Sequence, residues 1–272
     1  MSHGPTKIPS FGRCIYCGSD KEPLTDEHIV PLSLGGQHVL EAGSCPKCAQ
    51  ITSAFELDVC RGLWGDARIS YDAPSRRKKK RKTHITLPPA QGEATPITIP
   101  YSEYPGAFTF YTMRPAGYLQ GLPKDVDISR EWQFSVIVDE SRKEDFLRKY
   151  PNRLTMQFKH VPESFGRLLA KIAYGNTLCS LHPDDFHPLC LPYILGAERN
   201  ISYIVGSDFS TAAPTPGIGY ELNTGIQGSA DKITIVSEIR LLANNQTPKY
   251  HVIVGEVYGR ENVKNILSKL GP

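Results

Sequence analysis

The sequence predicts an α+β protein in which a small cysteine-rich module precedes a larger domain with a mostly antiparallel sheet. Three observations predict this arrangement. Two C-x2-C pairs lie within 35 residues near the N-terminus, a block of seven basic residues and four prolines follows, and the remainder is rich in short strand-like segments. We therefore divide the 272 residues into a module at 1–71, a linker at 72–100 and an α+β domain at 101–272.

The composition is that of an ordinary soluble protein, with 40% hydrophobic and 22% charged residues. We find no run of 18 apolar residues, so no membrane span is expected, and the N-terminus lacks the apolar core of a signal peptide. These features predict a cytoplasmic protein. The charge is uneven: residues 76–82 are all basic, whereas residues 1–75 carry six Lys or Arg against nine Asp or Glu.

The paired cysteines predict a structural zinc site. Two residues separate Cys14 from Cys17, two separate Cys45 from Cys48, and 27 residues lie between the pairs. Each short spacing lets a tight turn direct both sulfurs toward one ion, and the two turns complete a tetrahedral site with no position left for a substrate. Seven cysteines without an export signal argue against a disulfide framework. The three single cysteines are predicted to be buried free thiols: Cys60, Cys179 and Cys190.

The segment LTDEHIVPLSLGG, residues 24–36, lies between the cysteine pairs. Hydrolysis of a phosphodiester needs a base that activates water and a divalent cation that neutralises charge on the phosphate. His28 can be the base, and an adjacent carboxylate can hold the cation. For an isolated Asp-Glu-His the better interpretation is a solvated turn with a satisfied histidine, but its position between two metal-binding turns favours catalysis.

The order of these motifs resembles the four-cysteine HNH endonuclease family, over about residues 12–60. The resemblance implies a β-hairpin and a helix around a catalytic Mg²⁺ or Mn²⁺, the ββα-metal fold, and cleavage of nucleic acid, usually DNA. It implies that His28 is the general base and that Glu27 is a metal ligand. Asp26 is the alternative ligand, because residues 26 and 28 share a face of an extended strand.

One position departs from the family pattern. The family has Asn directly after the last cysteine, and this chain has Ala49, which cannot bind a metal. In the helix that follows, Glu56 is the best replacement ligand, since hard cations prefer carboxylate oxygens, although a surface glutamate is an equally good interpretation. His38, just after the Gly-Gly turn, is a candidate phosphate contact, with a solvated loop histidine as the alternative. The other polar candidates are Gln50, Thr52 and Ser53.

The basic block predicts contacts with the phosphates of duplex DNA, which raise affinity without selecting a sequence. The alternatives are a solvated charged linker and a localisation-like tract. Together with the prolines that follow, the block predicts an irregular linker at 72–100. It consists of Arg76, Arg77, Lys78, Lys79, Lys80, Arg81 and Lys82.

The third region alternates between predicted strands and helices. Segments rich in β-branched or aromatic residues predict strands at 108–113, 132–138, 154–160, 201–205, 218–223, 233–239 and 250–257. Helices are expected at 162–174, from about residue 141 and at 261–270. The segment LHPDDFHP, residues 181–188, is better interpreted as a polar loop than as a metal site.

The sequence therefore predicts a metal-dependent DNA endonuclease whose C-terminal domain recognises a target, senses a ligand or mediates oligomerisation or binding to a protein partner. The resemblance implies a bacterial or phage origin and a role in defence or mobile-element biology. The main alternative is a catalytically inactive zinc module that binds nucleic acid or protein. A catalytic C-terminal domain is disfavoured, because we find no catalytic spacing in that region.

Overall fold

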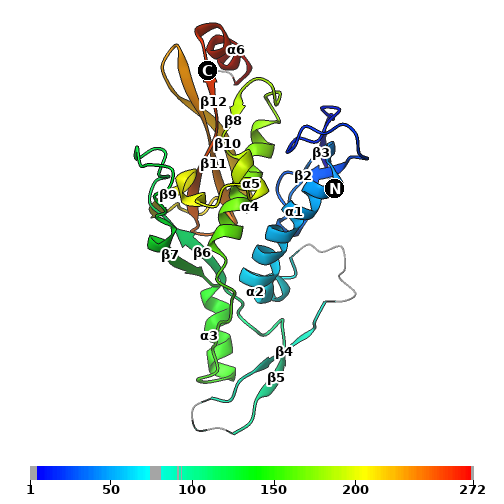
Figure 1. The fold of residues 1–272 in the computed structure, drawn as a ribbon. Helices are drawn as coiled ribbons and strands as arrows, with labels where there is room; N and C mark the ends of the chain where they lie inside the picture. Colours follow the sequence, from blue (N-terminus) through cyan, green and yellow to red (C-terminus); the bar gives the residue numbers. More distant parts are fainter. Residues whose placement is uncertain (1–4, 74–80, 91, 93, 271–272) are drawn as a thin grey trace.

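The computed structural model describes residues 5–73, 81–90, 92 and 94–270. In the N-terminal module a small sheet precedes two helices (Figure 1). Its strands are β1 (Thr6–Ile8), β2 (Thr25–His28) and β3 (His38–Ser44), in the order β1-β3-β2, with β1 parallel and β2 antiparallel to β3. A short 3-10 turn, η1 (Leu32–Leu34), joins β2 to β3. This arrangement confirms the predicted hairpin and helix.

Helix α1 (Pro46–Leu57) follows the second cysteine pair. Pro46 opens the helix, where the missing N–H costs nothing and the fixed φ angle is helical. The chain then continues through a π-helical turn, η2 (Asp58–Leu63), into α2 (Gly65–Ser70). Inserted π turns are rare and often mark functional sites.

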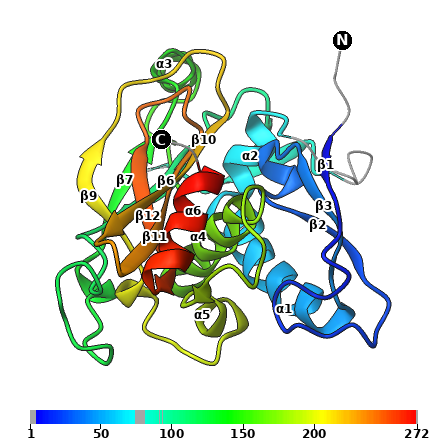
Figure 2. The same cartoon turned by 90° about the horizontal axis from the view of Figure 1, so that it is seen from above.

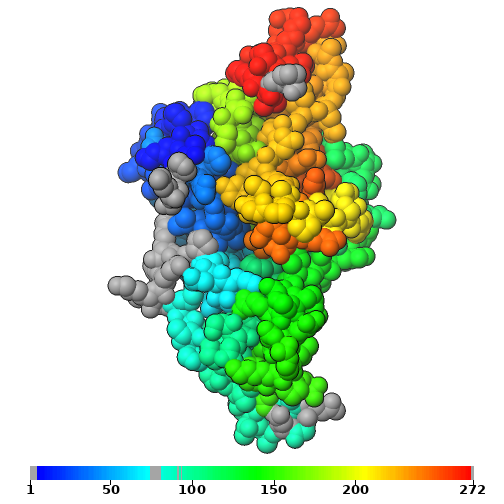
Figure 3. All heavy atoms as spheres, turned by 180° about the vertical axis from the view of Figure 1, so that it is seen from behind, coloured from blue at the N-terminus to red at the C-terminus, as the bar shows by residue number. Residues whose placement is uncertain are grey.

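The prediction that residues 72–100 form an irregular linker is wrong over its second half. Strands β4 (His84–Leu87) and β5 (Ile97–Pro100) form an antiparallel hairpin. Leu87 and Ile99 are buried in a small cluster with Phe146 of α3 (Glu140–Lys149). Figure 3 shows this part as the cyan and green end of the molecule, and Ile69 of α2 packs against the same cluster. The prolines lie at the ends of the hairpin strands, where a missing N–H is tolerated.

The C-terminal part is built on an antiparallel sheet. Its strands are β8 (His187–Pro188), β9 (Val205–Thr211), β10 (Tyr220–Gly228), β11 (Lys232–Leu241) and β12 (Pro248–Tyr258). The order is β10-β11-β12-β8, and β9 also pairs with β12. A separate ladder joins β6 (Phe108–Thr112) to β7 (Gln133–Ile137). These pairings confirm the mostly antiparallel sheet.

The helices of this part lie near the predicted positions. Helix α4 (Pro162–Thr177) packs on one side against β10, β11 and β12 and on the other side against α1. Figure 2 shows α4 between the sheet and the N-terminal module. Short α5 (Leu191–Leu195) and the terminal α6 (Arg260–Leu270) complete the fold. No helix among the described residues combines the length and the apolar character needed to cross a membrane.

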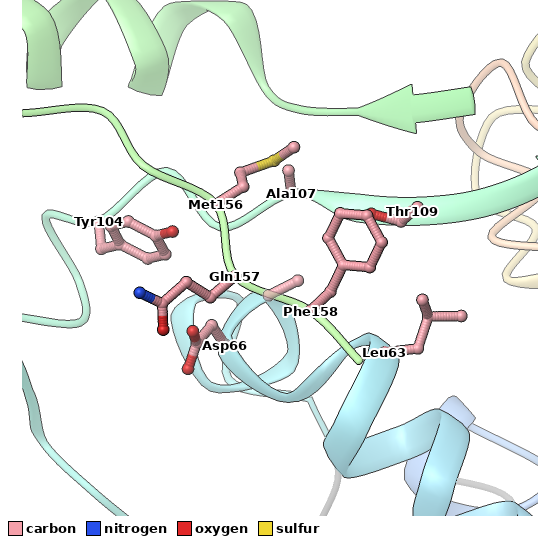
Figure 4. Close-up of a pocket in the computed structure, with 9 residues that line it drawn as sticks. Leu63, Asp66, Tyr104, Ala107, Thr109, Met156, Gln157 and Phe158 are labelled. Atoms are coloured by element: carbon pink, nitrogen blue, oxygen red, sulfur yellow. The ribbon is translucent and has the colours of Figure 1, made fainter. Parts of the chain in front are cut away.

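Two of the predicted strands are wrong. Residues 201–203 form a 3-10 turn before β9, and residues 154–160 are extended without pairing in a ladder. The 154–160 backbone bonds elsewhere: the Lys159 amide donates to the Gly62 carbonyl (2.8 Å), and the Thr155 carbonyl accepts from the Tyr104 hydroxyl (2.6 Å). Figure 4 shows residues 156–158 between the helix that carries Asp66 and the β6 side. The crevice there encloses about 10 Å³, the room of about one water molecule, so it is too small to be a ligand site.

One hydrophobic core extends through both regions. Trp64 is fully buried, and its ring centroid lies 5.2 Å from Phe110 and 5.9 Å from Phe165 of α4. Its indole N–H donates to the Thr109 carbonyl (2.7 Å). Phe55 of α1 belongs to the same cluster. The N-terminal module therefore shares its core with the C-terminal part.

Candidate functional site

The four paired cysteines come together as predicted. Cys14 and Cys17 lie in the turn before β2, Cys45 caps α1, and Cys48 lies in its first turn. All four sulfurs lie within 4.8 Å of one another, and the Cys17 and Cys45 sulfurs are 3.7 Å apart. Tetrahedral zinc with Zn–S bonds of about 2.3 Å places sulfurs about 3.8 Å apart. The cluster is therefore compatible with a structural zinc ion.

The backbone around the first pair explains this geometry. The Gly18 amide donates to the Cys14 carbonyl (2.8 Å), and Gly18 has a φ of +73°, which favours glycine. The Ser19 carbonyl accepts from the Cys14 amide at 2.8 Å. These bonds close a tight turn that directs both sulfurs of the pair to one point.

Strand β2 presents the acid–histidine motif. Glu27 is buried, His28 is half-buried and Asp26 is exposed. An irregularity in the β2–β3 register lies between Thr25 and Glu27. The Asp26 carboxylate accepts from the Ala42 amide (3.1 Å), so it faces β3, whereas the Glu27 carboxylate accepts from the Tyr16 hydroxyl (3.2 Å) inside the module. The two acids therefore have different surroundings.

A groove runs along this motif. It encloses about 760 Å³ and is bounded by β2, η1, α1, the π turn and α4. All four residues predicted to be catalytic line it, together with Ala49. The polar and charged residues that line it are Asp26, Glu27, His28, Ser33, Thr52, Ser53, Glu56, Arg61, Arg68 and Lys171.

Lys171 of α4 lies between the carboxylates of Glu27 and Glu56. It is 1% exposed, and its ammonium contacts the Glu27 Oε1 at 2.8 Å and the Glu56 Oε1 at 2.9 Å. It also donates to the carbonyls of His28 and, at 3.3 Å, Ile29. Burial alone would lower the pKa of Lys171, but the two carboxylates outweigh burial and raise this pKa above its usual value. Lys171 is therefore charged at neutral pH.

Two arginines add positive charge to the groove. Arg68 donates to the Ser33 carbonyl (3.2 Å) and the Cys60 carbonyl (2.8 Å), so it joins η1 to the π turn. Burial lowers the pKa of the Arg68 guanidinium. Arg61 lies in the π turn and is exposed. The π turn thus brings Arg61 to the groove that Glu56 also lines.

The residues predicted to contact nucleic acid do not line the groove where the structure describes them. His38 begins β3, is half-buried, pairs with Thr6 of β1 and does not line the groove. The Arg81 guanidinium forms an ion pair with the Asp72 carboxylate at 2.6 Å, and Lys82 is exposed. The remaining members of the basic block lie outside the described residues: Arg76, Arg77, Lys78, Lys79 and Lys80.

The loop at 181–188 and the single cysteines lie outside the groove, apart from Cys60, which lines it. Asp185 pairs with Lys269 (2.7 Å), and in the described part of the chain the four cysteines form the one group with the geometry of a metal cluster. Cys60 and Cys190 are buried, as predicted, but Cys179 is exposed near the end of α4, so that prediction is wrong.

Lys171, Arg61 and Arg68 were not predicted as site residues from the sequence. The signal for Lys171 was present in the sequence, because Lys171 is the single charged residue in LLAKIAYG, within a predicted helix. A lysine in such a position needs a buried acidic partner. The identity of that partner could not be read from the sequence.

Comparison with known proteins supports the N-terminal assignment. Residues 14–56 match the sequence model of the family described as HNH endonuclease. The match begins at the first cysteine of the cluster and ends at Glu56 in the groove. Searches of curated proteins and of solved structures found no match. The module with the four-cysteine cluster is therefore similar to HNH endonucleases over residues 14–56, and the comparison leaves the C-terminal part unassigned.

Proposed function

We propose that the protein is an endonuclease that hydrolyses phosphodiester bonds of DNA in the groove beside β2. The observation that carries this proposal is the arrangement of His28 with Glu27 and Glu56 in one groove of an HNH module. In this mechanism the His28 imidazole takes a proton from the attacking water. The four-cysteine cluster keeps β2 and α1 in position for this step.

Glu27 is the proposed ligand of a divalent cation, with Asp26 as the alternative and Glu56 in place of the Asn that the family has at Ala49. Carboxylate oxygens from two elements converge in the groove, and such oxygens are preferred by Mg²⁺ and Mn²⁺. A bound divalent ion would neutralise charge on the scissile phosphate and the leaving oxygen. The donor set thus suits a cation, although the Lys171 ammonium now contacts both carboxylates.

Exposed basic groups support DNA as the substrate. Arg61 lies in the groove itself, and the basic block at 76–82 follows α2 in the chain. Contacts of these cations with phosphates would hold any duplex without reading its sequence. We propose that they position the backbone while His28 acts on one phosphate.

The second candidate is an inactive module that binds nucleic acid without cutting it. Two observations favour it: Ala49 stands where the family has a metal-binding Asn, and Lys171 contacts both carboxylates that would hold a divalent ion. Retention of His28 in the groove favours the endonuclease, because a binding module has no need of a general base there.

Cleavage of supercoiled plasmid with Mg²⁺ or Mn²⁺ tests the two candidates. His28→Ala should lower the rate about 10²-fold or more, the usual effect of losing a general base. His187→Ala is the matched control, because His187 is exposed on β8 outside the groove, and this variant should cleave like the wild type. Equal cleavage by His28→Ala and the wild type, or no cleavage by the wild type with either ion, would reject the endonuclease.

A further inference from the structure

The ammonium of Lys171 has all its donors in use inside the protein. An ammonium has three N–H donors. Around Lys171 Nζ lie the Glu27 and Glu56 carboxylates and the carbonyls of His28 and Ile29. The side chain is 1% exposed. Lys171 is therefore not placed to contact a phosphate in the groove.

The ammonium lies between the two carboxylates proposed as metal ligands. Glu27 Oε1 and Glu56 Oε1 are 2.8 and 2.9 Å from the same nitrogen, and they come from β2 and α1. Magnesium or manganese bound by both oxygens would lie roughly 2.1 Å from each, in the space that this nitrogen fills. The two cations therefore exclude each other from this position.

We propose that Lys171 is the resident cation of this site and a positioning residue: its ammonium holds Glu27 and Glu56 in place and must withdraw before a divalent ion can bind between them. Lys171 thereby sets the affinity of the N-terminal module for the ion, although it belongs to the C-terminal part. This inference rests on the proposed function, since the same two carboxylates are the proposed ligands.

Binding of Mn²⁺ to the zinc-loaded full chain, measured by electron paramagnetic resonance of the free ion, tests the inference without DNA. Lys171→Met keeps the length of the side chain and removes its charge. This variant should bind one Mn²⁺ per chain at least about 10-fold more tightly than the wild type, because the buried Glu27 and half-buried Glu56 carboxylates then lack a cation. Manganese does not compete well for the thiolates of the zinc cluster.

Lys159→Met is the matched control. Lys159 also joins the C-terminal part to an acid of the N-terminal module, Asp58 at 2.7 Å, but it does not line the groove. Its Mn²⁺ affinity should equal that of the wild type. Equal affinity of the wild type and Lys171→Met would overturn the inference, as would tight Mn²⁺ binding by Lys171→Met that persists after Glu27→Gln and Glu56→Gln are added.

A variant that does not fold still gives an answer. If Lys171→Met is insoluble, its refolding yield is measured with and without Mn²⁺. The inference requires Mn²⁺ to raise the yield of refolded protein, and an unchanged yield would overturn the inference. The result is also separable from the proposed function. A gain of Mn²⁺ binding in a protein that never cleaves DNA would support the role of Lys171 and reject the endonuclease.

Discussion

Replacing Cys14 by serine should remove the zinc ion and unfold the N-terminal module. Cys14, Cys45 and Cys48 are nearly inaccessible to solvent and belong to the main hydrophobic cluster with Phe55. A zinc ion held by the four cysteines would therefore join the turn before β2, the end of β3 and the start of α1, at the edge of the core. Loss of the ion leaves these three segments without a common link.

The size of this effect follows from the binding of the ion. Structural zinc in small modules contributes roughly 10–16 kcal/mol of apparent binding free energy at pH 7. Even half of the lower value, about 5 kcal/mol, equals the lower end of the stability of a whole domain. Since serine does not supply a thiolate, Cys14→Ser should be mostly unfolded or insoluble near room temperature.

Elemental analysis and thermal melting measure the prediction. The wild type purified without chelator should hold one zinc per chain, and a strong chelator should abolish its cooperative melt. Cys179→Ser is the matched control, because Cys179 is exposed and lies outside the cluster. It should keep the zinc and the melting temperature. A wild type without zinc, or one that melts at the same temperature after chelation, would refute the reasoning.

Three further predictions concern the ligand, the basic block and pH. Glu27→Gln should abolish the dependence of cleavage on the divalent ion or abolish cleavage, whereas Asp26→Asn should retain activity. Loss of activity in Asp26→Asn with activity retained in Glu27→Gln would make Asp26 the ligand. Neutralising residues 76–82 should weaken binding to all duplexes and lower the slope of log affinity against log salt by about 0.9 per lost contact. The rate of cleavage at saturating DNA should stay unchanged. Unchanged binding would show that the basic block is a spacer, and faster cleavage would show that the block inhibits the module. Burial lowers the pKa of His251 below 6.5, and its neutral Nε2 accepts from the Ala116 amide (2.9 Å). The contribution of the neutral His251 to the free energy of unfolding should therefore be present above pH 6.5 and lost as the pH falls through the lowered pKa. Urea melts of His251→Gln should therefore depend less on pH between 7.5 and 5 than urea melts of the wild type.

The N-terminal module could be predicted because its signals are local. Each cysteine pair needs one turn, and α1 begins at a proline directly after Cys45. The same holds for α4, whose apolar positions recur at helical spacing. The hairpin at β4 and β5 was missed because the neighbouring charges and prolines were given more weight than two short alternating segments. Residues 154–160 alternate like a strand, but neighbouring loops and side chains supply their hydrogen bonds.

The groove could be predicted only in part, for a related reason. His28 and Glu27 stand within one motif, so the sequence alone brings them together. Lys171 lies more than 100 residues from both of its carboxylate partners, and no periodicity in the chain specifies that contact. Long-range pairs of this kind depend on how α4 docks on the module.

Helix α4 gives the C-terminal part a role that the sequence could not assign. One turn after Lys171, the Tyr174 hydroxyl donates to the carbonyl of Ile15, which lies inside the first cysteine pair (2.8 Å). Next to it, Gly175 packs on Ile29, and a Cβ atom added there would lie 3.3 Å from that side chain. Through Lys171, Tyr174 and Gly175 the helix thus contacts the acidic pair, the turn of the first cysteine pair and the residue after His28. Any movement of α4 must therefore change the metal-binding turn and the proposed catalytic groove together, so a C-terminal domain that only tethers the module to a target does not account for this interface.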